Sequence, residues 1–109
     1  MALEAKDRRY LVVIQLDRSS DLHRVGQVVP AILGILTNAA LSAPEQAFRS
    51  SDGQLFGFLL KSRLNSGQIR ARFEGDTATN REDGIFIMEA GEDFNGIHFT
   101  RAWTWLQHH

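Results

Sequence analysis

Cysteine is absent from this sequence of 109 residues, and proline occurs only twice. Without cysteine the chain can form no disulfide bond, no zinc–thiolate site and no thiol nucleophile, and a reducing environment such as the cytoplasm is the location we expect. Because no linker or low-complexity segment interrupts the chain, we expect residues 1–109 to form a single domain.

A strong net charge and a long apolar run are missing as well. The formal net charge is -1, whereas a domain that binds nucleic acid through its phosphates usually carries a basic stripe. The charge balance therefore disfavours nucleic acid as a partner. The longest apolar stretch, residues 28–36, is too short to cross a bilayer, and the charged start MALEAKDRRY is unlike a signal peptide. We expect a soluble protein with no membrane partner.

Several sequence motifs of catalysis and ligand binding are also missing. The chain has no glycine-rich phosphate loop, no metal-binding helix motif and no Ser-His-Asp order. We therefore expect no cofactor and no bound metal, and catalytic machinery is not evident.

What the sequence does contain is a clear order of strands and helices. Residues 9–16 (RYLVVIQL) are apolar at both alternating sets of positions, which is typical of a central strand. Asp21 then precedes apolar residues at three- and four-residue spacings, which predict a helix. Pro30 lies inside this pattern, so we expect either a kink or a helix that begins near Val29.

The dipeptide Asp52-Gly53 predicts a β-hairpin with a two-residue turn between residues 45–51 and 54–60. This turn sets the pairing of the two strands, which is Arg49 with Phe56, Phe48 with Gly57 and Ala47 with Phe58. The ring of Phe48 is then expected to cover Gly57.

The second half of the chain follows a similar alternation. Asn65 is suited to cap a helix that ends near Gly75, and GIFIMEAG (84–91) is typical of another strand. Residues 97–106 fit a strand or a helix, and we expect a strand. The predicted fold is therefore an α+β ferredoxin-like βαββαβ two-layer sandwich with an additional C-terminal element.

Aromatic residues of the hairpin suggest an interface. The predicted pairing places Ala47, Arg49, Phe56, Phe58 and Leu60 on the sheet face without helices. Large exposed apolar patches usually mark interfaces, so a cover is expected. The cover is either the C-terminal element, with Trp103 and Trp105, or a second copy of the chain. We expect a homodimer, with a protein partner as a further occupant of this face.

The stretch QLFGFLLK (54–61) partly resembles the third-strand signature of RNA-recognition-motif domains. In that family, aromatic residues two positions apart stack on RNA bases. The resemblance implies RNA binding through Phe56 and Phe58.

Acidic residues form the second candidate site. The predicted fold brings Asp17, Asp52 and Asp83 to one end of the sheet, with His23 nearby. Carboxylates arranged in this way can hold Mg²⁺ or Mn²⁺ and activate water. In its strand-end aspartate the chain resembles small ferredoxin-like nucleases associated with CRISPR systems, which implies a metal-dependent nuclease.

Each acidic residue also has a structural interpretation. Asp21 is suited to cap a helix, Asp52 to form the turn and Asp83 to lie in a solvated polar loop, which leaves only Asp17 without a necessary structural role. Our leading hypothesis is a non-catalytic binding domain that acts as a homodimer through an aromatic sheet face. The alternative is a nuclease that uses Asp17 or an RNA-binding protein that uses Phe56 and Phe58.

Overall fold

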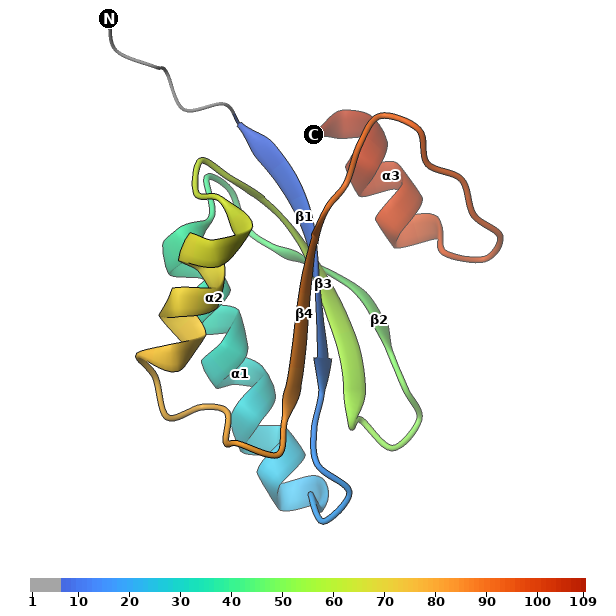
Figure 1. Cartoon of the computed structure of the whole chain (residues 1–109). Coiled ribbons are helices and arrows are strands. Elements are labelled where there is room, and N and C mark those ends of the chain that lie inside the picture. The colour runs from blue at the N-terminus through green and yellow to red at the C-terminus, as the bar shows by residue number, and fades with distance from the viewer. Residues whose placement is uncertain (1–6) are drawn as a thin grey trace, which may run out of the picture.

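The computed structural model describes residues 7–109, which form an α+β fold with one four-stranded antiparallel sheet and three helices (Figure 1). The first six residues of the charged N-terminal segment lie outside the described part of the chain. The elements in chain order are β1 (Arg8–Gln15), α1 (Leu22–Ala39), β2 (Glu45–Arg49), β3 (Leu55–Ser62), α2 (Ser66–Glu74), β4 (Gly84–Glu89) and α3 (Thr100–His108).

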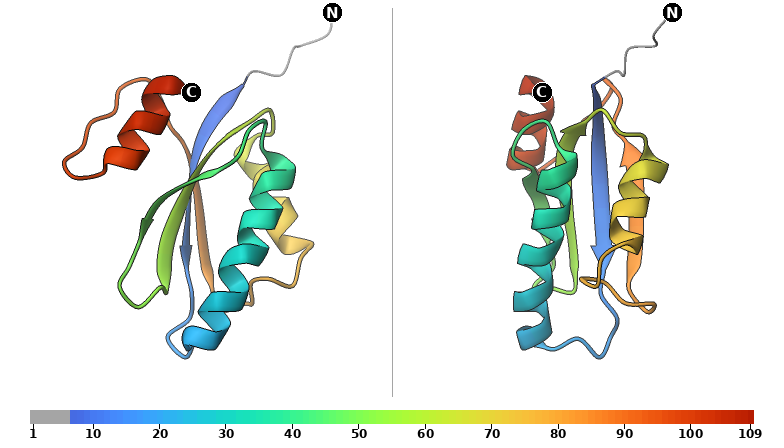
Figure 2. Two further views of the ribbon diagram at one scale, coloured as in Figure 1. Left: turned by 180° about the vertical axis from the view of Figure 1, so that it is seen from behind. Right: turned by 90° about the vertical axis from the view of Figure 1, so that its left-hand side faces the viewer.

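The strand order across the sheet is β2-β3-β1-β4, so β1 and β3 are central and β2 and β4 are the edges. Helices α1 and α2 cover one face of the sheet, and α3 lies on the opposite side, near one end of the strands (Figures 1 and 2). We call the sheet face opposite α1 and α2 the distal face.

The main core lies between the sheet and helices α1 and α2. On β1, Val12 pairs with Phe58 and Ile14 pairs with Phe56, so these four side chains point to the same face. All four are buried in one cluster with residues of α1 and α2, including Ile32. The prediction that Phe56 and Phe58 lie on the face without helices is therefore wrong. Since β1 and β3 are apolar on both faces, alternation alone could not show which face the helices cover.

The side chains of opposite parity form the distal face. Its apolar strand residues are Leu11 and Val13 of β1, Leu55 and Leu59 of β3, Phe86 and Met88 of β4, and Phe48 of β2, with Gly57 beside Phe48. The same pairing also places Arg9, Gln15, Lys61 and Glu45 on this face, so all four strands contribute apolar residues but the face is not entirely apolar.

The β2–β3 pairing was partly predicted. Phe48 pairs with Gly57 and Arg49 with Phe56, as expected, and the Phe48 ring lies over Gly57. A register shift between Gln46 and Phe48 then breaks the predicted pattern, because Gln46 instead of Ala47 pairs with Phe58. Such a bulge depends on contacts beyond the hairpin and has no local sequence signal here.

The turn of the hairpin differs from the predicted two-residue turn. The Gly53 N–H donates to the Ser50 carbonyl at 3.0 Å, so Ser51 and Asp52 occupy the centre of the turn. Gly53 follows with a φ of 74°, a conformation that glycine adopts at little cost. The glycine is thus needed as expected, but one position later in the turn.

Helix boundaries follow their capping residues. The Asp21 carboxylate accepts a hydrogen bond from the Arg24 N–H at 2.9 Å, and α1 continues from Leu22 through Pro30. The alternative start near Val29 is therefore wrong. Pro30 is exposed, so the backbone carbonyl that it leaves without a helical partner can bind water. In α2, Asn65 and Gln68 form a reciprocal capping box, and Gly75 ends the helix as expected.

The prediction of a strand at residues 97–106 is wrong, because Thr100–His108 form α3. Apolar residues here satisfy both the strand and the helix spacing, so the local pattern did not decide between them. In the helix Trp105 is buried, with Ala102 and Leu106 half-buried on either side. Tertiary packing against the sheet therefore selects the helix.

Candidate functional site

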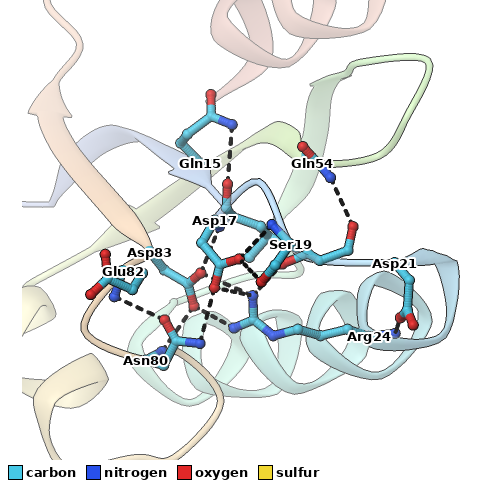
Figure 3. Close-up of polar contacts among 11 residues, drawn as sticks. Gln15, Asp17, Ser19, Asp21, Arg24, Gln54, Asn80, Glu82 and Asp83 are labelled. Carbon is cyan, nitrogen blue, oxygen red and sulfur yellow. Dashed lines mark hydrogen bonds and ion pairs between the residues drawn. The ribbon is translucent and has the colours of Figure 1, made fainter.

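A polar cluster lies where β1 ends, and its centre is the side chain of Asp83 (Figure 3). This carboxylate has no exposed surface, so the interpretation of Asp83 as a residue of a solvated loop is wrong. Arg24 of α1 donates to it twice, from Nη1 at 3.0 Å and from Nη2 at 2.5 Å. The backbone N–H groups of Asp17 and Asn80 donate at 3.0 and 2.8 Å. Asp83 thus joins β1, α1 and the loop before β4.

Burial opposes ionisation of Asp83, but these hydrogen bonds outweigh it. The guanidinium of Arg24 and the backbone N–H groups of Asn80 and Asp17 favour the charged form. Together they hold the pKa of Asp83 below its usual range. Asp83 is therefore an ionised acceptor in a satisfied network, and it lacks the raised pKa that a general acid needs near neutral pH.

Asp17 is held in the same cluster by its own loop. Its carboxylate accepts hydrogen bonds from the Ser19 hydroxyl and backbone N–H, the latter at 2.8 Å, and from the Asn80 side chain at 3.3 Å. The Ser19 hydroxyl is the main reason why the pKa of Asp17 lies below its usual range. Arg24 Nη1 lies 3.7 Å from Asp17 Oδ2. Asp17 therefore has the structural role that the sequence left open, which is to close the β1–α1 loop.

The other two acidic-site candidates lie apart from this contact network. Asp52 accepts from the Ser50 hydroxyl at 2.6 Å and from the Gln54 N–H at 3.0 Å, and these bonds lower its pKa. His23 is an exposed residue of α1. Within residues 7–109 no group of three or more His, Asp or Glu side chains has an arrangement suited to a metal ion. The cluster brings together Asp17 and Asp83 and adds Arg24, whose single positive charge lies close to both carboxylates.

Arg24 and Asn80 were not predicted as site residues because neither belongs to a motif. An arginine in the first turn of a helix and an asparagine in a polar loop are common on exposed surfaces. The packing of α1 beside the loop before β4 brings Arg24 to Asp83, and the conformation of that loop brings Asn80 there (Figure 3).

The distal face is the second candidate site, and its residues lie in rows across the strands. One row contains Phe48, Gly57, Val13 and Phe86, and the next contains Glu45, Leu59, Leu11 and Met88. Leu59 is buried, but Phe86 is 62% exposed and Met88 is 48% exposed. The apolar rows therefore continue from a covered part at β3 to an open part at β4.

Helix α3 covers the β2 side of this face. The Phe99 ring packs edge-on against Phe48 with ring centroids 6.5 Å apart, and Arg101 lies 3.5 Å from the Glu45 carboxylate. Arg9 of β1 donates from Nη1 to the Leu106 carbonyl at 2.7 Å, which fixes the end of α3. These contacts join α3 to β1 and β2, whereas β4 is the edge strand on the other side of β1.

The predicted interface residues have different surroundings. Phe56 and Phe58 are core residues, packed edge to face with centroids 5.9 Å apart. Trp105 is buried where α3 meets the sheet, whereas Trp103 is 43% exposed. Arg49 is exposed near the end of β2. Trp103 and Arg49 are therefore accessible to a partner, but Phe56 and Phe58 are not.

Comparisons with protein-family models, with curated proteins and with solved structures find no match to this chain. Among the helices within residues 7–109, none combines the length and the apolar character needed to cross a membrane.

Proposed function

We propose that this protein is a binding domain that associates with a second copy of itself through the distal face. The observation that carries the proposal is the exposure of Phe86 and Met88, at 62% and 48%, within the folded strand β4. An antiparallel sheet with one solvated face normally places polar residues there. The distal face has apolar residues at these positions instead.

Burial of these side chains supplies a driving force for association. Covering one large apolar side chain contributes about 1.5–3 kcal/mol before the entropic cost of association is subtracted. Phe86 and Met88 adjoin the half-buried Leu11 and Val13, so one partner can cover all four together. Contiguous apolar surface of this kind is typical of interaction sites.

A second copy fits this face because the exposed centre carries no charge. Leu11, Val13, Leu55, Phe86 and Met88 are all uncharged. Two copies can therefore bring these apolar side chains together without burying an unpaired charge. Burial of an unpaired charge would cost several kcal/mol. A twofold interface uses the same patch on both copies and needs this self-complementarity.

We further propose that the fold is a ferredoxin-like sandwich, with α3 as its added C-terminal element. The order β1-α1-β2-β3-α2-β4 and the placement of α1 and α2 on one face support this assignment. The fold occurs with many functions, so it adds no argument for any one of them.

The two alternatives receive less support from the geometry. RNA stacking on Phe56 and Phe58 requires accessible rings, but these rings are in the core. A metal-dependent nuclease requires carboxylates free to bind a cation, but the guanidinium of Arg24 already contacts both Asp17 and Asp83. For these reasons we favour a non-catalytic role.

The proposal is tested by the mass of the unmodified protein in solution. Light scattering after size-exclusion chromatography, over a range of micromolar concentrations, is expected to give twice the chain mass of 12.3 kDa. A mass of one chain throughout this range would overturn the proposal.

A further inference from the structure

We infer that the second copy binds in a reciprocal arrangement, in which the aromatic side of α3 in each copy packs on β4 of the other. This inference rests on the proposed function and specifies its geometry. The surfaces involved are the α3 patch, defined as Ile97, Phe99 and Trp103, and the β4 patch, defined as Phe86 and Met88.

The two patches lie on the same side of the sheet but over different strands. Helix α3 packs against β2, at one edge, and the opposite edge is β4 (Figures 1 and 2). The distal side therefore has a raised part, formed by α3, and a lower part, formed by the uncovered strands. A flat partner surface could not contact both parts equally well, whereas a partner with the same step can.

A twofold axis that runs parallel to the strands, between two facing distal faces, satisfies this shape. Rotation by 180° about such an axis exchanges the two edges of the sheet, so α3 of one copy lies over β4 of the other. The converse contact forms at the same time, because in a twofold dimer every contact between two different residues occurs twice. The α3 patch and the β4 patch thus become complementary parts of one interface.

The side chains of the α3 patch are available for this contact. Phe99 is 53% exposed although its ring touches Phe48, and Trp103, one helical turn later, is 43% exposed. Ile97, in the segment before the helix, is 79% exposed. These exposed side chains are not the main attachment of α3 to the sheet, because Trp105 of the same helix is buried there.

The exposed area agrees with a small specific dimer. A large side chain presents roughly 150–250 Å², so the exposed fractions of the five patch residues amount to on the order of 600 Å² per copy. Two copies would bury about 1,200 Å², the lower end of the range for stable interfaces. The half-buried Val13 and Leu55 of the same face add to this area.

The absence of cysteine from the chain allows a direct test by disulfide trapping. Met88→Cys and Trp103→Cys are prepared as separate proteins with different affinity tags, mixed, and oxidised with glutathione disulfide. The reciprocal arrangement predicts a disulfide between Cys-containing copies of the two different variants. The yield of this heterodimer should exceed the yield of either disulfide-linked homodimer at least several-fold.

A control pair replaces Trp103→Cys with Leu22→Cys, because Leu22 is 80% exposed on α1, on the other side of the sheet. Little disulfide-linked heterodimer is expected from that pair. A dimer by light scattering together with equal yields from both pairs would overturn the reciprocal arrangement and leave the proposed function intact. A single-chain mass would overturn both.

Discussion

The guanidinium of Arg24 contacts both carboxylate oxygens of Asp83, with Nη1 3.0 Å from Oδ1 and Nη2 2.5 Å from Oδ2. This pair connects the first turn of α1 to the loop that leads into β4. Two-point contacts between arginine and a carboxylate are among the stronger side-chain interactions. The Asp83 side chain has no exposed surface and is the main partner of Arg24.

Replacing Asp83 with alanine is therefore expected to lower the free energy of unfolding by about 3 kcal/mol, since Arg24 loses its main partner and the N–H groups of Asp17 and Asn80 lose their acceptor. Urea denaturation followed by circular dichroism measures this change. Asp93→Ala is the control, because Asp93 is exposed and its removal should cost less than about 0.5 kcal/mol. Equal losses in the two variants would contradict the structural role of Asp83.

The same pair predicts how stability depends on pH. The pKa of Asp83 is lower in the folded than in the unfolded state, so the folded state stabilises the charged form. Its contribution is present above the unfolded-state pKa of about 4 and is lost as the pH falls through the lower folded-state value. We expect the free energy of unfolding to fall below about pH 4 more steeply in the unmodified protein than in Asp83→Asn. Parallel pH profiles would show that Asp83 contributes nothing to this dependence.

Alanine substitutions at Gly57 and Gly34 are expected to change the free energy of unfolding in opposite directions. A Cβ at Gly57 would lie 2.7 Å from Phe48 Cζ, so Gly57→Ala should lower the free energy of unfolding by about 1–3 kcal/mol through overpacking. At Gly34, inside α1, a Cβ would meet nothing within 4 Å, so Gly34→Ala should raise the same free energy by about 0.5–1 kcal/mol. Denaturation curves of both variants check this prediction. A stabilised Gly57→Ala would refute the close approach of Phe48.

The two tryptophans report separately on the core of the chain and on its proposed interface. Trp105→Phe retains the exposed Trp103, whose emission should shift to shorter wavelength as concentration rises and the second copy removes water. Trp103→Phe retains the buried Trp105, whose emission should stay constant over the same range. Fluorescence spectra from nanomolar to micromolar protein measure the difference. A constant Trp103 emission would count against its burial in a dimer.

The sequence correctly predicted the features that depend on neighbouring residues alone. Asp21, Asn65 and Gly75 mark helix ends because a cap depends on a few neighbouring residues. Phe48 opposite Gly57 followed in the same way from the hairpin. The face assignment of Phe56 failed because both faces of its strand are apolar, so the position of the helices decides it.

The candidate site depended more strongly on tertiary structure. Asp17, Asp52 and Asp83 were predicted to lie together at one end of the sheet. Asp17 and Asp83 are in contact, with the Asp17 N–H 3.0 Å from Asp83 Oδ1, whereas Asp52 bonds to Ser50 and Gln54. The partner that determines their chemistry, Arg24, comes from another element and has no motif. Residues 97–106 fit both a strand and a helix periodicity, and the choice of a strand was wrong. Of the α3 patch, Trp103 was named as an interface residue, whereas Ile97 and Phe99 were not.

The most direct measurement of the proposed self-association is sedimentation equilibrium of Phe86→Asp beside Leu22→Asp. Both substitutions place a charge on an exposed apolar residue, but Phe86 lies on the distal face and Leu22 on α1. We expect Leu22→Asp to retain the mass of two chains and Phe86→Asp to give the mass of one, at 12.3 kDa, because a buried unpaired carboxylate is too costly to accommodate. If both variants keep the mass of two chains, the dimer does not form through the distal face.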